Sequence, residues 1–337
     1  MKQGEYLTDS PNMPPADVRA IQGMVVKKSQ GSYNVVVGET EFPCSLSNKL
    51  RKQLVFPMAD PGSLRRRVVG VEDIRELDPI AIGDQVRFVD PGDGTGMIVK
   101  VLPRQNKLVR RAAGPRPLEQ VIVANVDQVM PVFAAAFPEP KWELLDRYLA
   151  AAESQGLRAL ICITKLDLAD SVELRAEVAN YERMGYSVIV TSSATGAGVP
   201  EFRKAIEGSI SVLMGKSGVG KSSLLNAVEP GLGIRVNEVS LVTGKGKHTT
   251  THLEMFRLAG GGGIVDTPGM REFSLWDVDT ADLAELFPDL RPYLGTCRFG
   301  AGCHHDCEPG CAVKRAVESG AISERRYQSY LRLRVGD

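Results

Sequence analysis

The sequence predicts a multidomain α/β protein in which a small N-terminal β-barrel or sandwich precedes a central α/β domain and a helical C-terminal domain. Three observations support this prediction: short strands separated by glycines, a regular alternation of strands and helices, and a dense cysteine cluster after residue 296. With 337 residues, the chain is long enough to form two or three separate cores.

Composition places the chain among ordinary globular proteins. Hydrophobic residues make up 43% and charged residues 24%, which excludes collagen-like, disordered and disulfide-scaffold classes. No segment approaches the ~18 apolar residues of a membrane span, and residues 1–15 lack the apolar centre of a signal peptide. We therefore expect a cytoplasmic protein without membrane contact.

The N-terminal region alternates short apolar strands with turn residues. After a polar tail, residues 19–111 contain the strand-like segments IQGMVV, GSYNVVVG, GDQVRFV and GTGMIVKVL. Strands of this length and spacing are typical of a small barrel or sandwich. Residues 52–79 fit this pattern poorly and are predicted to form an inserted loop.

Two basic runs lie in this region although the whole chain has no net charge. Residues 100–116 contain six basic and no acidic residues, and residues 48–68 contain six basic residues and one acidic residue, Asp60. Such runs are typical either of a solvated face or of a surface that binds a phosphate backbone.

Strand–helix alternation begins after residue 117. The pattern predicts helices at 141–155, 171–184 and 199–207, and strands at 160–164, 187–191 and 209–214. This alternation is typical of a mostly parallel sheet, which binds ligands at the carboxyl ends of its strands.

The last of these strands leads into a phosphate-binding loop. Gly215–Ser222 reads GKSGVGKS, a full match to GxxxxGK[ST] between a predicted strand and a predicted helix. Lys221 is predicted to lie between the β- and γ-phosphates as a catalytic residue, and Ser222 to ligate Mg²⁺. The expected nucleotide-binding residues here are Gly215, Lys216, Ser217, Gly218, Val219, Gly220, Lys221, Ser222 and Ser223.

Two polar segments downstream have the order of GTPase switches. The apolar residues 263–265 end in Asp266-Thr-Pro-Gly269, a DxxG sequence whose Asp holds Mg²⁺ through water and whose Gly senses the γ-phosphate. Before it lies Lys245–Thr251, KGKHTTT, in which Thr250 is expected to ligate Mg²⁺.

Two further motifs lie upstream of the phosphate loop. One predicted strand ends in Thr164-Lys165-Leu-Asp167 and the next leads into Ser192-Ser193-Ala194. A carboxylate such as Asp167 accepts two hydrogen bonds from guanine that adenine cannot donate, and Lys165 packs along the base. Because the motifs close successive strands, together they predict a guanine-specific site.

The motif order TKLD, SSA, GKSGVGKS, HTTT and DTPG, followed by a Cys/His cluster, resembles one family: RsgA (YjeQ), circularly permuted GTPases that depend on the small ribosomal subunit. The resemblance implies an OB-fold barrel, a permuted GTPase domain and a zinc-binding domain. It implies GTP hydrolysis with Mg²⁺, stimulated by the small subunit, and a role late in that subunit's maturation. The expected divisions are a tail at 1–17, the barrel at 18–113, the GTPase domain at 114–280 and the zinc domain at 281–337.

The chain departs from the family pattern near the nucleotide. Many members have Asn where this chain has Thr164, and many GTPases have a water-orienting Gln where Met270 stands. His248 is therefore our candidate to position water beside Lys221 and Thr250, although it is equally typical of a solvated loop histidine.

The cysteine cluster also differs from the family's Cys-x4-Cys-x-His-x5-Cys set, because five residues separate Cys297 from Cys303. The expected ligands of one structural zinc ion are Cys297, Cys303, His305 and Cys311. A site of four cysteines that uses Cys307 instead of His305 is the alternative.

The resemblance gives the basic runs a partner, the ribosomal RNA of the small subunit. The candidate RNA-binding residues are Lys49, Arg51, Lys52, Lys107, Arg110 and Arg111. A second contact is expected at Arg325, Arg326, Arg332 and Arg334.

Two other functions remain open on the sequence. One is a P-loop ATPase or kinase, against which Asp167 and the HTTT segment argue. The other is a nucleotide-dependent RNA-binding module with negligible hydrolysis. The expected partners are GTP, GDP and the small subunit, and the chain is expected to be monomeric.

Overall fold

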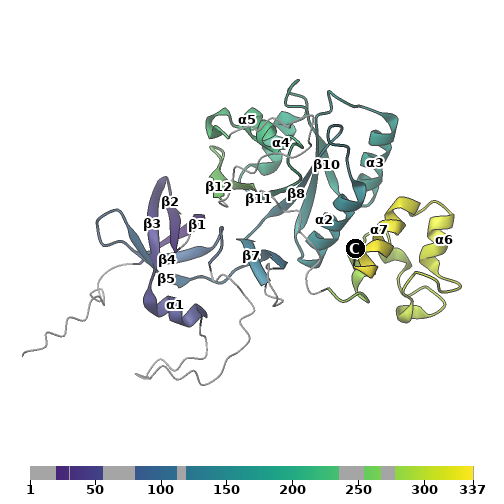
Figure 1. Cartoon of the computed structure of the whole chain (residues 1–337), viewed down its shortest axis with the longest axis horizontal. Helices are drawn as coiled ribbons and strands as arrows, with labels where there is room; N and C mark the ends of the chain where they lie inside the picture. The colour runs from purple at the N-terminus through teal and green to yellow at the C-terminus, as the bar shows by residue number, and fades with distance from the viewer. Residues whose placement is uncertain are drawn as a thin grey trace, which may run out of the picture.

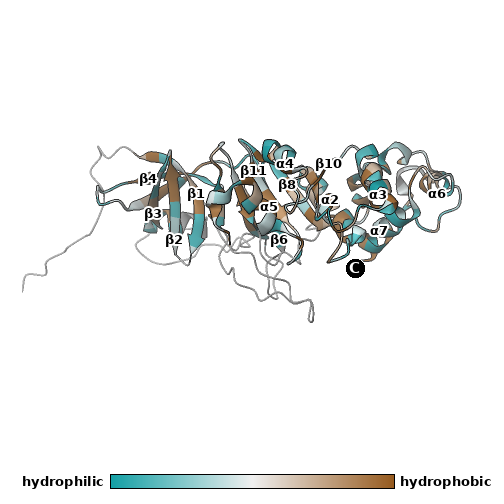
Figure 2. Ribbon diagram, turned by 90° about the horizontal axis from the view of Figure 1, so that it is seen from above, coloured by the Kyte–Doolittle hydropathy of each residue, from teal (hydrophilic) through white to brown (hydrophobic). Residues whose placement is uncertain are grey.

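The computed structural model describes residues 20–29, 31–55, 80–111, 119–234, 254–266 and 278–336. Its three parts lie in a row: a barrel, a central sheet flanked by helices, and a helical C-terminal part (Figures 1 and 2). Among these residues no helix combines the length and the apolar character needed to cross a bilayer.

The N-terminal part is a closed five-stranded barrel. β1 pairs with β2 and β4, β2 pairs with β3, and β5 closes the ring by pairing with β3 and β4. The bounds are Ile21–Ser29 (β1), Ser32–Val37 (β2), Thr40–Leu46 (β3), Asn48–Val55 (α1), Gln85–Val89 (β4) and Gly96–Val101 (β5). A small barrel of five strands with these pairings is typical of the OB-fold, which the resemblance implied.

Two elements of the barrel differ from the sequence prediction. β3 was not predicted, because Pro43 interrupts the apolar alternation on which strand prediction depends. The expected loop from residue 52 begins inside α1, and residues 56–79 of that loop lie outside the described residues.

A separate hairpin connects the barrel to the central sheet. β6 (Lys107–Arg111) pairs with β7 (Glu119–Ala124) and with no barrel strand. The Asn125 side chain donates to the Gly83 carbonyl at 2.8 Å, which ties the hairpin to the barrel. The chain from β7 continues into β8 (Gln128–Ala134), which belongs to the central sheet and not to the hairpin.

The central sheet has six strands in the order β10-β9-β8-β11-β13-β12, and β12 is the antiparallel member. The strand bounds are Gln128–Ala134 (β8), Arg158–Thr164 (β9), Ser187–Val190 (β10), Ile210–Met214 (β11), Glu254–Arg257 (β12) and Gly263–Asp266 (β13). The strand that precedes the phosphate loop, β11, lies between the strands that come before it in the chain and those that follow it. The strands that carry the base-reading motifs therefore come before the phosphate loop in the chain, which is the permuted arrangement that the motif order predicted.

Helices cover both faces of this sheet (Figure 1). Their bounds are Trp142–Ser154 (α2), Val172–Arg183 (α3), Val199–Ile206 (α4) and Lys221–Val228 (α5). Successive residues of β8 face opposite sides of the sheet. Phe133 packs with α2 and α3, whereas its neighbour Val132 packs with α4 and α5. The predicted helices and strands of this part agree with the structure to within about two residues.

The C-terminal part holds two helices, α6 (Ala312–Glu318) and α7 (Glu324–Val335), and short 3-10 turns. It docks on α2 and α3 through a buried ionic network. Asp146 of α2 is fully buried and accepts hydrogen bonds from Arg326 (2.6 Å), Arg325 (2.8 Å) and the Tyr181 hydroxyl (2.7 Å). The expectation that Arg326 contacts RNA is wrong, because its side chain is fully buried in this network.

Replacing Asp146 with Ala should therefore destabilise the docked C-terminal part. The buried Arg326 guanidinium would lose its 2.6 Å partner, and removing one member of a buried pair costs about 3–5 kcal/mol. The free energy of unfolding from urea denaturation measures the loss. Glu143→Ala is the matched control, because Glu143 forms an exposed ion pair with Arg332 between the same two parts. Equal effects of the two substitutions would contradict this account.

Candidate nucleotide site and Cys/His cluster

The phosphate loop turns tightly between β11 and α5. Gly220 directly precedes α5 and has φ +97°, in the left-handed region that glycine adopts without strain. A Cβ on Gly215 would stand 2.4 Å from the Val132 carbonyl oxygen of β8. Gly215 thus packs closely against β8, and Gly220 allows the sharp turn into α5 that a phosphate-binding loop requires.

Lys221 and Asp266 are both largely buried and lie close enough for their charges to interact. The Lys221 ammonium donates to the Gly215 carbonyl at 2.9 Å. Burial lowers the pKa of Lys221 and raises the pKa of Asp266, and the attraction between the two charges opposes both shifts. Within the described residues, Asp266 Oδ1 is buried without a hydrogen-bond partner. An unpartnered carboxylate oxygen beside a phosphate loop fits a hydrated Mg²⁺ ion.

The end of β9 is attached directly to the phosphate loop. The buried Thr164 hydroxyl donates to the Val219 carbonyl, and the Lys165 ammonium donates to the Gly218 carbonyl at 2.7 Å. Lys165 also donates to the Phe137 carbonyl in the loop before α2. Thr164 thus holds the loop although its side chain is shorter than the Asn that the resemblance leads one to expect at this position.

The two motifs predicted to read the base meet in space. The Ser192 hydroxyl donates to the Asp167 carboxylate at 2.5 Å and accepts from the Thr195 N–H at 3.2 Å. Ser192 is buried whereas Asp167 is exposed, so the hydrogen bond orients a carboxylate that remains open to a ligand. Ser193 and Ala194 lie in the same turn, with Ala194 exposed.

Several predicted site residues lie outside the described part of the chain. These are the switch segment 245–251, with His248 and Thr250, and the residues Gly269 and Met270. Their assignments remain predictions from the sequence.

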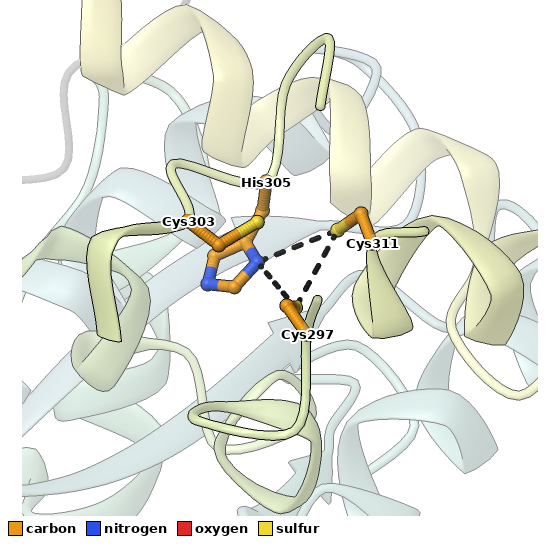
Figure 3. A group of neighbouring side chains, drawn as sticks. All are labelled: Cys297, Cys303, His305 and Cys311. Atoms are coloured by element: carbon orange, nitrogen blue, oxygen red, sulfur yellow. Dashed lines mark hydrogen bonds between the residues drawn. The ribbon is translucent and has the colours of Figure 1, made fainter. Parts of the chain in front are cut away.

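The four predicted metal ligands come together in the C-terminal part (Figure 3). The ligand atoms of Cys297, Cys303, His305 and Cys311 lie within 4.8 Å of one another, and all four residues are buried. Nδ1 of His305 lies 3.4 Å from Sγ of Cys297 and 3.4 Å from Sγ of Cys311. Cys307 is exposed and lies outside this group, which argues against the site of four cysteines. The cluster can hold one metal ion.

Sequence reasoning missed the residues that support this cluster. The Glu308 carboxylate accepts from the backbone N–H groups of His304 (2.8 Å) and Asp306 (2.9 Å), and the Tyr327 hydroxyl donates to the His305 carbonyl at 2.7 Å. These contacts shape the loop around His305, whose φ is +60°. Spacing alone offers no signal for them, because the partners come from a loop turn and from α7.

The predicted RNA-binding residues fall into two groups. Lys49 and Arg51 are exposed on α1, and the side chain of Lys52 lies outside the described residues. The others belong to β6 of the hairpin and not to the barrel. There Lys107 forms an ion pair with Glu119, and Arg110 donates to Gln120 at 2.9 Å. The side chain of Arg111, also on β6, lies outside the described residues.

The phosphate loop follows a central strand of a mostly parallel sheet, and its lysine interacts with the charge of Asp266. An exposed carboxylate, Asp167, lies at the end of a nearby strand. These features define a permuted P-loop nucleotide hydrolase. Comparison with known proteins identifies which one. The model of the RsgA GTPase family matches residues 101–276, about half of the chain. The chain belongs to this family, and the protein is a GTPase.

Relatives and solved structures agree with this assignment. A protein of Gemmatimonas aurantiaca named small ribosomal subunit biogenesis GTPase RsgA is 46% identical, over 93% of this chain and 96% of its own length. A protein of that name from Azotobacter vinelandii is 42% identical, over 81% and 79%. YjeQ from Thermotoga maritima has a TM-score of 0.70 at 31% identity, covering 95% of this chain and all of that one. YloQ, described as a circularly permuted GTPase, has a TM-score of 0.65 at 28% identity, covering 96% and 97%.

The contact between Thr164 and the phosphate loop is open to a direct test. Thr164→Val keeps the shape of the side chain but leaves the Val219 carbonyl without its donor, and a lost buried hydrogen bond costs about 1–2 kcal/mol. We expect a dissociation constant for GDP about tenfold higher, measured by titration with a fluorescent nucleotide. Thr164→Ser retains the hydroxyl and should bind nearly as tightly as the wild type. Unchanged affinity of Thr164→Val would show that the contact does not position the loop.

Proposed function

We propose that this protein hydrolyses GTP in response to the small ribosomal subunit and acts late in the maturation of that subunit through contacts with its RNA. The observation that carries the nucleotide assignment is the attachment of β9 to the phosphate loop through Thr164 and Lys165. Asp167 follows Lys165 by two residues and its side chain is exposed, which supports a site shared by Asp167 and the loop. The relatives' shared name, small ribosomal subunit biogenesis GTPase, supports the partner.

In this proposal each motif has a separate role. Asp167 and the Ser192–Ala194 turn bind guanine, and the loop from Gly215 to Ser223 binds the phosphates. Lys221 offsets negative charge on the γ-phosphate during hydrolysis. Ser222, Thr250 and Asp266 are the candidate residues for Mg²⁺, which neutralises phosphate charge when bound. Gly269 senses the γ-phosphate, and His248 positions the attacking water.

The proposed RNA contact is the exposed face of α1, where Lys49 and Arg51 lie. Cationic side chains bind the phosphate backbone irrespective of base sequence, which suits recognition of RNA by shape. We also propose a division of the chain into a tail that ends at residue 17, a barrel that ends at 113, a GTPase domain that ends at 280 and a C-terminal domain. The protein is proposed to be monomeric and cytoplasmic.

The metal proposed for the Cys/His cluster is one structural zinc ion. A tetrahedral site with Zn–S near 2.3 Å and Zn–N near 2.0 Å has edges of about 3.8 Å between sulfurs and about 3.5 Å between sulfur and nitrogen. Cys297 and Cys311 have their sulfurs 3.8 Å apart, and each lies 3.4 Å from His305 Nδ1. Because four protein ligands occupy all positions of a tetrahedron, no position stays open for a substrate or water, and the proposed zinc ion has a structural role.

Cys303 and Cys307 provide a matched pair for testing this assignment. Cys303→Ala should remove a ligand, release the zinc and lower the melting temperature, because zinc binding contributes directly to the stability of such domains. Cys307→Ala should retain one zinc per chain, because its side chain is exposed and outside the cluster. Elemental analysis of the purified proteins gives the zinc content. Retention of zinc by Cys303→Ala would reject the ligand set.

The proposed function is tested by phosphate release from GTP with and without isolated small subunits, and with ATP as control substrate. We expect slow hydrolysis by the protein alone and a stimulation of about tenfold or more by small subunits, because a partner that completes a GTPase site increases its rate strongly. Large subunits serve as the control partner. An absence of stimulation would reject the ribosomal role, and equal use of ATP would reject the role of Asp167.

A further inference from the structure

The barrel and the central sheet are joined by an apolar seam at β1 and β12. A register shift between Val25 and Lys27 leaves Val26 as an extra residue in β1. Val25 is buried in the barrel core, whereas Val26 packs in the cluster that contains Met255 of β12 and Val265 of β13. The barrel therefore shares a hydrophobic core with the strands beside the nucleotide.

A single row of directly opposed residues crosses this seam. Lys27 of β1 pairs with Glu254 of β12, Glu254 pairs with Asp266 of β13, and Asp266 pairs with Leu213 of β11. Adjacent strands lie about 4.8 Å apart, so Asp266 lies about two strand spacings from the barrel. Leu213 is two residues before Gly215, where the phosphate loop begins.

Ion pairs attach both ends of β12 to the barrel. Lys27 Nζ lies 3.1 Å from Glu254 Oε2, and Arg257 Nη2 lies 3.0 Å from Glu39 Oε1 in the turn after β2. A strand paired on both edges cannot slip by one residue without turning its side chains to the wrong face. β12 therefore links β1 to β13 through one backbone pair, a shared apolar cluster and two ion pairs.

We infer that β12 couples the barrel to the GTPase centre and that Glu254 and Lys27 are positioning residues for subunit-stimulated hydrolysis. This inference rests on the proposed function, since it names the route by which a partner bound to the barrel affects Asp266. Coupling of this kind requires the partner to favour one arrangement of β1 against β12 over another. The opposite charges of Lys27 and Glu254 stabilise the arrangement in which these two residues are paired. Neither residue contacts the phosphate loop in the described structure.

Charge reversal across the β1–β12 pair tests the inference. Lys27→Glu places like charges directly opposite each other, which weakens the pairing. We expect kcat at saturating small subunits to fall about threefold or more, while the basal rate and the half-saturating subunit concentration change by less than about twofold. The double variant Lys27→Glu/Glu254→Lys restores opposite charges and should recover most of the lost kcat.

The exposed ion pair between Asp170 and Arg175 at the start of α3 provides the control. Arg175→Glu should leave the stimulated kcat unchanged. A full stimulated kcat in Lys27→Glu, a change confined to the half-saturating subunit concentration, or an equal loss in Arg175→Glu would overturn the inference.

A second measurement requires no ribosomes and separates this inference from the proposed function. Amide hydrogen exchange in β1 is compared between the GDP-bound protein and the protein bound to a non-hydrolysable GTP analogue. We expect the exchange rates in β1 to differ about threefold between the two states in the wild type and to differ less in Lys27→Glu. Identical exchange in both states overturns the inference. If small subunits fail to stimulate the wild type, the proposed function fails and hydrogen exchange alone decides the inference.

Discussion

The nucleotide site depends on the contact between the end of β9 and the phosphate loop. Thr164 and Val219 are 55 residues apart, yet the hydroxyl of one donates to the carbonyl of the other. Lys165 forms the neighbouring bond with Gly218. Pairing with β8 brings the ends of β9 and β11 near each other, and these bonds then fix the segments proposed to bind base and phosphate to one another. A displacement at either end would separate the two halves of the ligand's binding surface.

Permutation of the chain leaves this contact intact because sheet pairing depends on which strands are adjacent, not on their order in the sequence. β11 is paired with β8 on one side and β13 on the other, and both pairs are parallel. The permutation changes what is joined covalently. The chain leaves β13 at Asp266, and the next described residues, from 278 onward, belong to the C-terminal part. In the order of the sequence, the strand that ends at the proposed Mg²⁺ site is therefore the last strand before the C-terminal part.

Much of the site could be predicted because its chemistry depends on local spacing. The phosphate loop, the meeting of Asp167 with Ser192 and the four metal ligands all follow from short motifs. The predictions about charged residues were weaker, because a sequence does not show whether an arginine faces water or a carboxylate. Arg326 was placed on a binding surface but is buried against Asp146, a residue 180 positions away. β12 was missed because its four residues, Glu-Met-Phe-Arg, contain only two apolar residues between charged ends and show no apolar run or alternation.

The two outer parts are attached to the central sheet by different physical means. The barrel is joined by backbone pairing between β1 and β12, by an apolar seam around Val26 and Met255, and by two exposed ion pairs that salt screens. The C-terminal part is joined by Asp146 and its two arginines, whose burial protects the charges from solvent but requires every partner to be present. A paired strand transmits displacement along its backbone, whereas a buried ionic network holds one arrangement and resists intermediate ones. The proposed coupling to Asp266 therefore belongs to the barrel side, whereas the buried network suits the C-terminal part to a fixed position.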